Sequence, residues 1–210
     1  MAHILITAGP TRAYLDDVRY LTNASSGRMA AALARAALAA GHQVTIVSGP
    51  VSVRYPQAAR VIPVVTTSDM LEASLPLLPK VDGVIATAAP CDFEPITRAT
   101  GKLPRQDGLT LELRPTRDVI ATLARQAAPA QWLVAFALEP DGNSDRALQK
   151  IDAKRCDLIV LNDLTALDTT TTAVTVYDRR HERIGSKAGT KQTVARWLLR
   201  LIDRLALATE

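Results

Sequence analysis

Short apolar runs alternate with longer segments of helical periodicity along most of the chain. Continuous apolar runs bounded by polar residues are typical of strands that are buried on both faces of a parallel sheet. Pro63 lies inside one of these runs, which favours a short strand at the edge of the sheet. The sequence predicts strands at residues 3–7, 43–47, 60–65, 83–88, 132–137 and 157–162.

Segments with helical periodicity or helix-capping residues lie between these runs. The expected helix caps are Ser25 or Ser26, residues 67–69, and Thr190, with Gly41 as the left-handed end of the first helix. Helices are predicted from about 29 to 40, 67 to 78, 118 to 128, 144 to 154 and 194 to 207. The core face of the last helix is expected to hold Trp197, Leu198, Leu201, Ile202 and Leu205.

The alternation of strands and helices predicts an α/β fold with a doubly wound, mostly parallel, Rossmann-like sheet. Residues 109–113 alternate as a half-exposed strand should, and residues 173–177 with 182–184 resemble a closing hairpin. These segments predict a small antiparallel addition to the sheet. At 210 residues the chain is long enough for one good core, so a single domain over residues 1–210 is expected.

Composition narrows the class of protein. The hydrophobic content of 48% and the charged content of 22% are those of a soluble globular protein, and only 4% aromatic residues argue against a nucleic-acid partner. The net charge of +4 is scattered along the chain, as suits a small polyanionic ligand. Neither a secretion signal nor an apolar run of ~20 residues is visible, so we expect a cytoplasmic protein with no membrane partner. Nothing suggests that Cys91 and Cys156 form a disulfide.

A long polar loop follows the first predicted strand and leads into an alanine-rich helix. It contains many hydrogen-bonding side chains, among them Arg12, Asp17, Arg19 and Asn23, and loops of this kind usually serve a ligand. The beginning of the helix would offer free N–H groups and the positive end of its dipole, which favours an anion. The set expected to contact the substrate or an anion is Gly9, Thr11, Arg12, Arg19, Asn23, Ser25, Ser26 and Gly27.

Polar loops also follow the strands that end near Ala88 and Ala137. Because the carboxyl ends of parallel strands gather at one edge of the sheet, these loops are expected to share one cleft. A dinucleotide fits this cleft poorly, since the first strand is not followed by G-x-G-x-x-G and Pro10 removes a backbone donor. A hydride-transferring oxidoreductase is therefore disfavoured.

A mononucleoside triphosphate is a better ligand. Lys150 and Lys154 lie four residues apart on a predicted helix and project from one face, although lysines at this spacing are often only solvated. Lys102 lies in a polar segment that resembles a lid, and Asp92 follows a strand where it can accept hydrogen bonds from a ribose or a base. The sequence shows no P-loop and no cluster of metal ligands, and Cys91 is interpreted as a buried thiol. Such a site would work by positioning and charge.

These motifs resemble a known family. The segments at residues 6–12 and 17–27 are similar to the opening of phosphopantothenoylcysteine synthetases, the second activity of the bacterial coenzyme A biosynthesis flavoprotein. Weaker similarities follow in the same order at residues 45–50, 88–93, 117–120 and 157–163. The resemblance covers nearly the whole chain.

The resemblance implies a ligase that joins 4'-phosphopantothenate to L-cysteine through an acyl-cytidylate made from CTP, with Mg²⁺ accompanying the CTP. Asn23 would hold this intermediate, and Lys102 would serve its formation. The residues implied to surround the nucleotide are Ala86, Thr87, Ala88, Asp92, Lys102, Arg117, Asp118, Val119, Ile120, Phe136, Lys150 and Lys154.

The resemblance also implies a homodimer whose lid reaches toward the partner subunit. No FMN is expected, and the decarboxylase that follows in the pathway would be a separate protein. The lid reads Lys102-Leu103-Pro104-Arg105 where the family has Lys-x-Lys-Lys, and residues 90–91, 138–140 and 167–172 also depart from the family pattern. An ATP-dependent ligase and a nucleotide-binding relative without ligase activity stay open as alternatives.

Overall fold

The computed structural model describes residues 1–105, 107–139, 144–162 and 169–206, with the side chains of 205 and 206 left out. Several predictions from the sequence concern residues outside this description. They are the polar turn at 140–143, Asp163 at the end of a motif, the loop at 167–168, residue 207 and the core-facing side chain of Leu205.

An eight-stranded sheet in the order β12-β11-β10-β9-β6-β1-β4-β5 forms the centre of the molecule. Strands β1 (His3–Ala8), β4 (Gln43–Ser48), β5 (Arg60–Pro63), β6 (Gly83–Ala86), β9 (Trp132–Leu138) and β10 (Leu158–Asn162) are parallel. Strands β11 (Thr171–Asp178) and β12 (Arg183–Thr190) add an antiparallel pair. The predicted fold class is confirmed, and β5, which contains Pro63, is an edge strand as expected.

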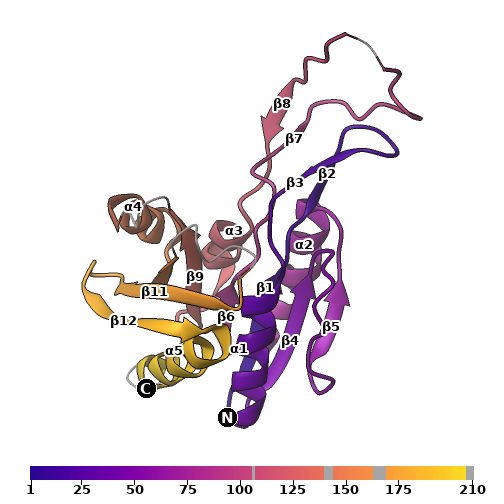
Figure 1. Ribbon diagram of the computed structural model, residues 1–210. Helices are drawn as coiled ribbons and strands as arrows, with labels where there is room; N and C mark the ends of the chain where they lie inside the picture. Colours follow the sequence, from indigo (N-terminus) through magenta and orange to yellow (C-terminus); the bar gives the residue numbers. More distant parts are fainter. Residues whose placement is uncertain (106, 140–143, 163–168, 207–210) are drawn as a thin grey trace.

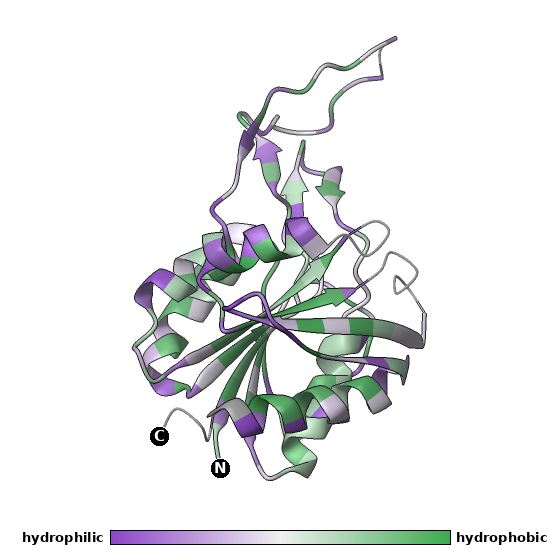
Figure 2. Ribbon diagram, turned by 90° about the vertical axis from the view of Figure 1, so that its left-hand side faces the viewer, coloured by the Kyte–Doolittle hydropathy of each residue, from purple (hydrophilic) through white to green (hydrophobic). Residues whose placement is uncertain are grey.

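Helices cover both faces of the sheet (Figure 1). Helices α1 (Arg28–Ala39) and α5 (Lys191–Ala206) pack on one face, over Ile4, Ile6 and Ala8 of β1. Leu5, which alternates with these residues, faces α2 (Thr67–Ser74), the 3₁₀ helix η1 (Leu75–Lys80), α3 (Val119–Gln126) and α4 (Ser144–Lys154). Figure 2 shows the apolar strands between these two helical layers, which is the arrangement that period-two alternation in a doubly covered sheet requires.

Two short antiparallel ribbons project from the body of the molecule (Figure 1). One is the hairpin of β2 (Arg12–Tyr14) and β3 (Tyr20–Thr22), and the other pairs β7 (Phe93–Pro95) with β8 (Leu113–Pro115). We call residues 12–22, 93–105 and 107–115 the arm. The strand predicted at 109–113 is wrong: pairing begins at Leu113 and lies in the arm, where Leu109 and Leu113 have no core to cover and stay 48% and 40% exposed.

Two predicted helix caps are wrong and two predicted helix ends are confirmed. Gly27, and neither Ser25 nor Ser26, is the N-cap of α1, which begins at Arg28. Glycine suits this position because its φ of 70° is left-handed and a β-carbon there would lie 3.0 Å from the Tyr55 hydroxyl. Thr66, and not a residue in 67–69, is the N-cap of α2, in a capping box with Asp69.

The other two predicted helix ends are confirmed. The hydroxyl of Thr190 accepts from the N–H of Thr193 at 3.2 Å in the first turn of α5, and Gly41, at φ 87°, ends α1.

None of the helices in the described part of the chain is long and apolar enough to cross a membrane. Both cysteines are free and buried. Burial raises the pKa of Cys156 to about 12, so this thiol is inert at neutral pH.

Candidate functional site

A cavity of about 470 Å³ opens at the carboxyl ends of β1, β6, β9 and β10. The chain leaves β1 toward β4 on one side and later returns to β6 on the other, so the cavity lies where the strand order reverses. It is lined by residues 23–30 at the end of the loop that leads into α1, by residues 87–90 after β6, and by residues 136–138 at the end of β9. The polar loops after β1 and β6 therefore share one cleft, as predicted, while residues 140–143 of the third predicted loop lie outside the described residues.

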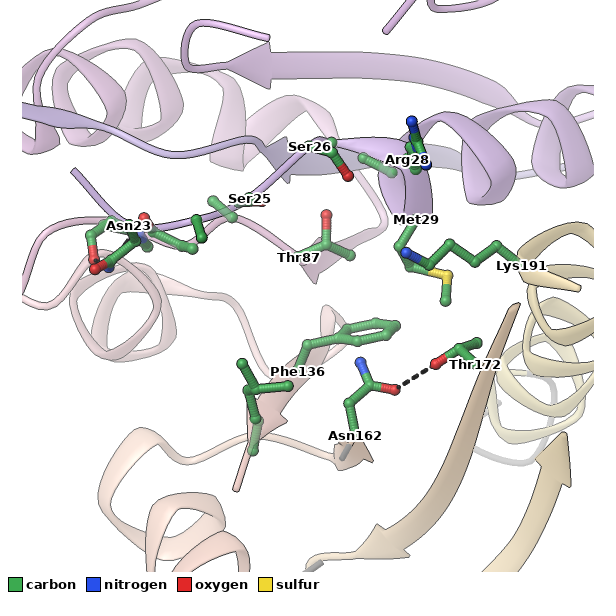
Figure 3. A pocket seen from close by; sticks show the side chains of 18 of the residues that line it. Asn23, Ser25, Ser26, Arg28, Met29, Thr87, Phe136, Asn162, Thr172 and Lys191 are labelled. Carbon is green, nitrogen blue, oxygen red and sulfur yellow. Dashed lines mark hydrogen bonds between the residues drawn. The ribbon is translucent and has the colours of Figure 1, made fainter. Parts of the chain in front are cut away.

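The beginning of α1 forms one side of the cavity. Figure 3 shows Ser25, Ser26 and Arg28 along this side, with Phe136 and Asn162 opposite them. Helix geometry leaves the first N–H groups of a helix without an acceptor inside the helix, and Gly27 makes no side-chain cap bond. This side of the cavity is therefore suited to a negatively charged group.

Asn23 lines the cavity at the point where β3 returns from the arm. Its side-chain nitrogen donates to the carbonyl oxygens of Ala89 at 3.3 Å and Pro90 at 2.8 Å. Both bonds use the amide nitrogen, so they orient the side chain and leave its carbonyl oxygen out of this contact. The amide is held between two loops that both belong to the cavity.

A second pocket of about 80 Å³ adjoins the first and shares Ala88, Pro90, Asp92, Phe136 and Lys154 with it. The beginning of α3 forms its far side, where the Asp118 carboxylate caps the helix by accepting from the N–H of Ala121 at 3.0 Å. Nearly all residues predicted to surround a nucleotide meet here. Ala86, Ala88, Asp92, Arg117, Asp118, Val119, Ile120, Phe136 and Lys154 line this pocket, and Thr87 and Lys150 line the larger cavity.

Both predicted lysines of α4 are paired with carboxylates. Lys150 forms an ion pair with Glu139, whose side chain is 4% exposed, and Lys154 Nζ lies 3.2 Å from Asp118 Oδ2. A buried carboxylate needs a partner, so Lys150 is held at the cavity by Glu139. Because Lys150 keeps 44% of its side chain exposed, it can also reach an anion in the cavity.

Three polar residues that line the cavity were not predicted from the sequence. Asn162 ends β10 and accepts a hydrogen bond at 3.2 Å from the Thr172 hydroxyl, and Lys191 begins α5 (Figure 3). Asn162 had a usable signal, since it is a polar residue at the end of a buried strand. Thr172 and Lys191 had none, because only the antiparallel return of β11 and β12 brings them to this edge.

Five predicted site residues do not line either cavity. Thr11 is fully buried, and its hydroxyl bonds to the Thr67 hydroxyl and accepts from the N–H of Cys91, both at 2.8 Å. Gly9 turns at φ 70°, where a β-carbon would lie 2.7 Å from Val51. Arg12, Arg19 and Lys102 lie in the arm.

Two of the positively charged side chains of the arm contact other residues of the arm. The guanidinium of Arg12 lies 4.2 Å above the ring of Tyr20, and a hydrogen bond to Tyr14 raises the pKa of Arg12. Arg19 donates to the carbonyl oxygen of Leu103 at 2.9 Å. Most predicted site residues thus line the cavities at the sheet edge, and Arg12, Arg19 and Lys102 lie apart from them in the arm.

Cys91 is buried beside the smaller pocket, and its thiol donates to the carbonyl oxygen of Thr11 at 3.3 Å. The interpretation as a buried thiol is confirmed. Among the described residues, no group of three or more His, Cys, Asp or Glu side chains could hold a metal ion.

Comparison with known proteins gives consistent results. The family model described as the DNA/pantothenate metabolism flavoprotein C-terminal domain matches residues 1–205. The coenzyme A biosynthesis bifunctional protein CoaBC of Bacillus subtilis is 46% identical over 166 residues, which are 78% of this chain and 41% of that protein. The chain therefore spans about two fifths of the length of that relative.

Solved structures agree with this family. The crystal structure of the C-terminal domain of CoaBC is similar with a TM-score of 0.83 and 34% identity, covering 99% of this chain and 98% of that one. A mutant of Cab2 in complex with phosphopantothenate-cysteine shares the fold, with a TM-score of 0.79 and 18% identity over 99% of this chain and 89% of that one.

Proposed function

Because the chain belongs to the family of DNA/pantothenate metabolism flavoprotein C-terminal domains, we propose that it is a phosphopantothenate–cysteine ligase of coenzyme A biosynthesis. One observation supports this most directly. Apart from Lys102, the residues that the family pattern assigns to the nucleotide come from four separate segments, and they gather around two adjoining cavities with Asn23 on the wall of the larger one. The reaction would take place in the cytoplasm, where free cysteines such as Cys91 and Cys156 persist.

The reaction proceeds in two steps. A carboxylate oxygen of 4'-phosphopantothenate attacks the α-phosphorus of CTP, pyrophosphate leaves, and an acyl-cytidylate forms. The amine of L-cysteine then attacks the acyl carbon, CMP leaves, and the nitrogen loses a proton as the amide forms. Holding the reactants together can contribute roughly 7–11 kcal/mol to such a step.

The smaller pocket is the proposed site of the base. We propose CTP rather than ATP because the motifs of this chain and their order resemble those of the bacterial ligases. Lys150 and Lys154 are placed to meet the triphosphate. Lys150 does so while it keeps its ion pair with the buried Glu139, and Lys154 exchanges its contact with the half-exposed Asp118 for phosphate oxygens. The beginning of α1 takes a further anionic group of the substrates.

Magnesium fits this site as a companion of CTP. Mg²⁺ keeps several waters and takes most other ligands from phosphates, so one carboxylate is enough from the protein, and Asp92 lines both cavities. When bound, the ion neutralises charge on the triphosphate.

The first test is pyrophosphate release from the purified protein with 4'-phosphopantothenate and magnesium. We expect release with CTP, at least about 10-fold slower release with ATP, and conversion to the cysteine amide only when L-cysteine is present. The factor of 10 corresponds to about 1.4 kcal/mol between a fitting and a misfitting base. Nucleotide binding without any pyrophosphate release would refute the ligase and favour a nucleotide-binding relative that has lost the activity.

A homodimer formed through the arm is part of the proposal. Large apolar side chains are exposed along it, with Val18 at 58%, Phe93 at 54% and Ile96 at 52%. A cluster of this kind on a projecting segment is typical of an interface. We expect a dimer at micromolar concentration in sedimentation equilibrium, and a monomer after Phe93→Asp.

The matched control for this change is Val61→Asp, because Val61 is 41% exposed on edge strand β5 and belongs to the body of the molecule. It should stay dimeric. A monomeric wild type, or a dimer that survives Phe93→Asp, would rule out association through the arm.

A further inference from the structure

Asp16 is a fully buried carboxylate at the tip of the β2–β3 hairpin. Its oxygens accept hydrogen bonds from the N–H groups of Val18 at 2.7 Å, Arg19 at 2.6 Å and Leu103 at 3.0 Å. Burial alone would raise the pKa of Asp16, but these three bonds and the nearby Arg19 guanidinium lower it. The carboxylate is therefore ionised at neutral pH and joins the hairpin to the segment after residue 101.

Asp17 makes a second connection to the same segment. Its carboxylate accepts from the N–H of Gly101 at 2.7 Å and from the Arg98 guanidinium at 2.8 Å, and these bonds lower the pKa of Asp17. Its own N–H donates to the carbonyl oxygen of Gly101 at 3.1 Å. Gly101 has a φ of 73°, so it makes a left-handed turn at the point where it is held.

These contacts fall on the two residues that flank Lys102. Asp17 holds Gly101 on one side, and Asp16 with Arg19 holds Leu103 on the other. Lys102 itself is exposed between them. Its α-carbon is fixed relative to the hairpin while its ammonium group stays available.

The same hairpin ends at Asn23, which lines the main cavity. Since Lys102 does not line that cavity, it must approach the reacting phosphate by movement of the arm or in the cavity of a partner subunit. In both cases the hairpin and the Lys102 segment move together, because the contacts that join them involve both sides of Lys102.

From this geometry we propose that Asp16 and Asp17 are positioning residues for Lys102 and fix the place from which its ammonium group serves formation of the acyl-nucleotide. This inference rests on the proposed function. Neither carboxylate contacts the substrates in this proposal, so both act only through the backbone on either side of Lys102.

The test compares Asp17→Ala, Lys102→Ala and the double variant in the pyrophosphate assay. Asp17 is half exposed, so Asp17→Ala is expected to fold. We expect kcat for pyrophosphate release to fall about 10- to 100-fold in Asp17→Ala, with KM for CTP within about twofold, because a displacement near 1 Å can cost as much as 100-fold. The double variant should be no slower than Lys102→Ala alone.

Two further measurements separate positioning from a general effect on the arm. Hydrogen exchange at the amides of Gly101 and Leu103 should become faster in Asp17→Ala and in Asp16→Asn. Glu94→Gln is the matched control, because it removes an exposed ion pair with Arg114 between β7 and β8 without touching the segment around Lys102. It should keep the wild-type rate.

The proposal is overturned if Asp17→Ala keeps the wild-type rate while Lys102→Ala is impaired, or if the two losses multiply in the double variant. Unchanged exchange at Gly101 and Leu103 would also overturn it. If the wild type itself releases no pyrophosphate, the proposed function fails instead, and the exchange measurement still decides whether the two carboxylates hold this segment.

Discussion

Replacing Asn23 with alanine is expected to stop the second step of the proposed reaction while the first step continues. An acyl-nucleotide needs hydrogen-bonding groups around it when the amine attacks, and Asn23 presents an oriented amide on the cavity wall. Loss of one such group typically costs about 10²- to 10³-fold. We therefore expect amide formation to fall by that factor in Asn23→Ala. Rapid quench and chromatography should show acyl-cytidylate accumulating to about one equivalent of enzyme.

The control for Asn23→Ala must remove a similar contact without removing a group from the cavity. Thr22→Val does this, because the Thr22 hydroxyl donates to the carbonyl oxygen of Thr11 at 2.8 Å at the base of the same hairpin. Each change removes hydrogen bonds worth about 1 kcal/mol apiece, so both proteins should stay folded. Thr22→Val should keep both steps. If Asn23→Ala lost pyrophosphate release as fully as amide formation, its role would lie in binding or folding.

The sequence was sufficient to predict the central sheet because a buried parallel strand requires a continuous apolar run. Ile4, Leu5 and Ile6 are all fully buried, since each face of β1 is covered by helices. The shared cleft followed from the same reasoning, because parallel strands must end at one edge. Most residues around the cleft were named only through the family resemblance, because the position of a strand end does not say which side chains face the cleft.

The arm could not be predicted, because its strands are three residues long and Ala13 is the only buried residue in them. Period-two alternation at residues 109–113 looked like a sheet strand, yet alternation indicates burial only where a second layer exists to bury one face. Gly27 was missed as a helix cap for a related reason. A β-carbon at Gly27 would crowd Val51 and Tyr55, which come from a distant segment, and no local pattern records that constraint.

Charged residues in the loops were easy to recognise as functional candidates. Their positions relative to the cleft were hard to predict. Arg12, Arg19 and Asp17 appeared as one polar loop near an anion, but the structure uses all three inside the arm. Lys191 lies far along the chain from the opening loop, and it reaches the cavity because the antiparallel return of β11 and β12 brings the beginning of α5 to this edge. The composition of a loop can predict that the loop binds a ligand. Which side chains contact that ligand depends on long-range packing.

The largest expected effect on stability comes from Gly49, where the backbone after β4 lies against the backbone after β1. Gly49 follows β4 and donates its N–H to the carbonyl oxygen of Ala8 at 3.0 Å. A β-carbon at this position would lie 1.6 Å from the carbonyl oxygen of Pro10, where the loop toward the arm begins. Because the atom in the way belongs to the backbone, no change of rotamer can relieve the overlap.

Gly49→Ala is therefore expected to lower the free energy of unfolding by at least about 3 kcal/mol, a large part of the 5–15 kcal/mol typical of a domain. Urea denaturation followed by circular dichroism measures this loss. Pro10 also bridges to Ala89 on the cavity wall, so any folded fraction should bind CTP more weakly in a thermal shift assay.

Gly108→Ala is the matched control, because a β-carbon there meets nothing within 4 Å and its φ is not left-handed. It should change stability by less than about 0.5 kcal/mol. A loss below about 1 kcal/mol in Gly49→Ala would mean that residues 8–10 can move away from this turn, and the cavity wall would then be less rigid than the contact implies.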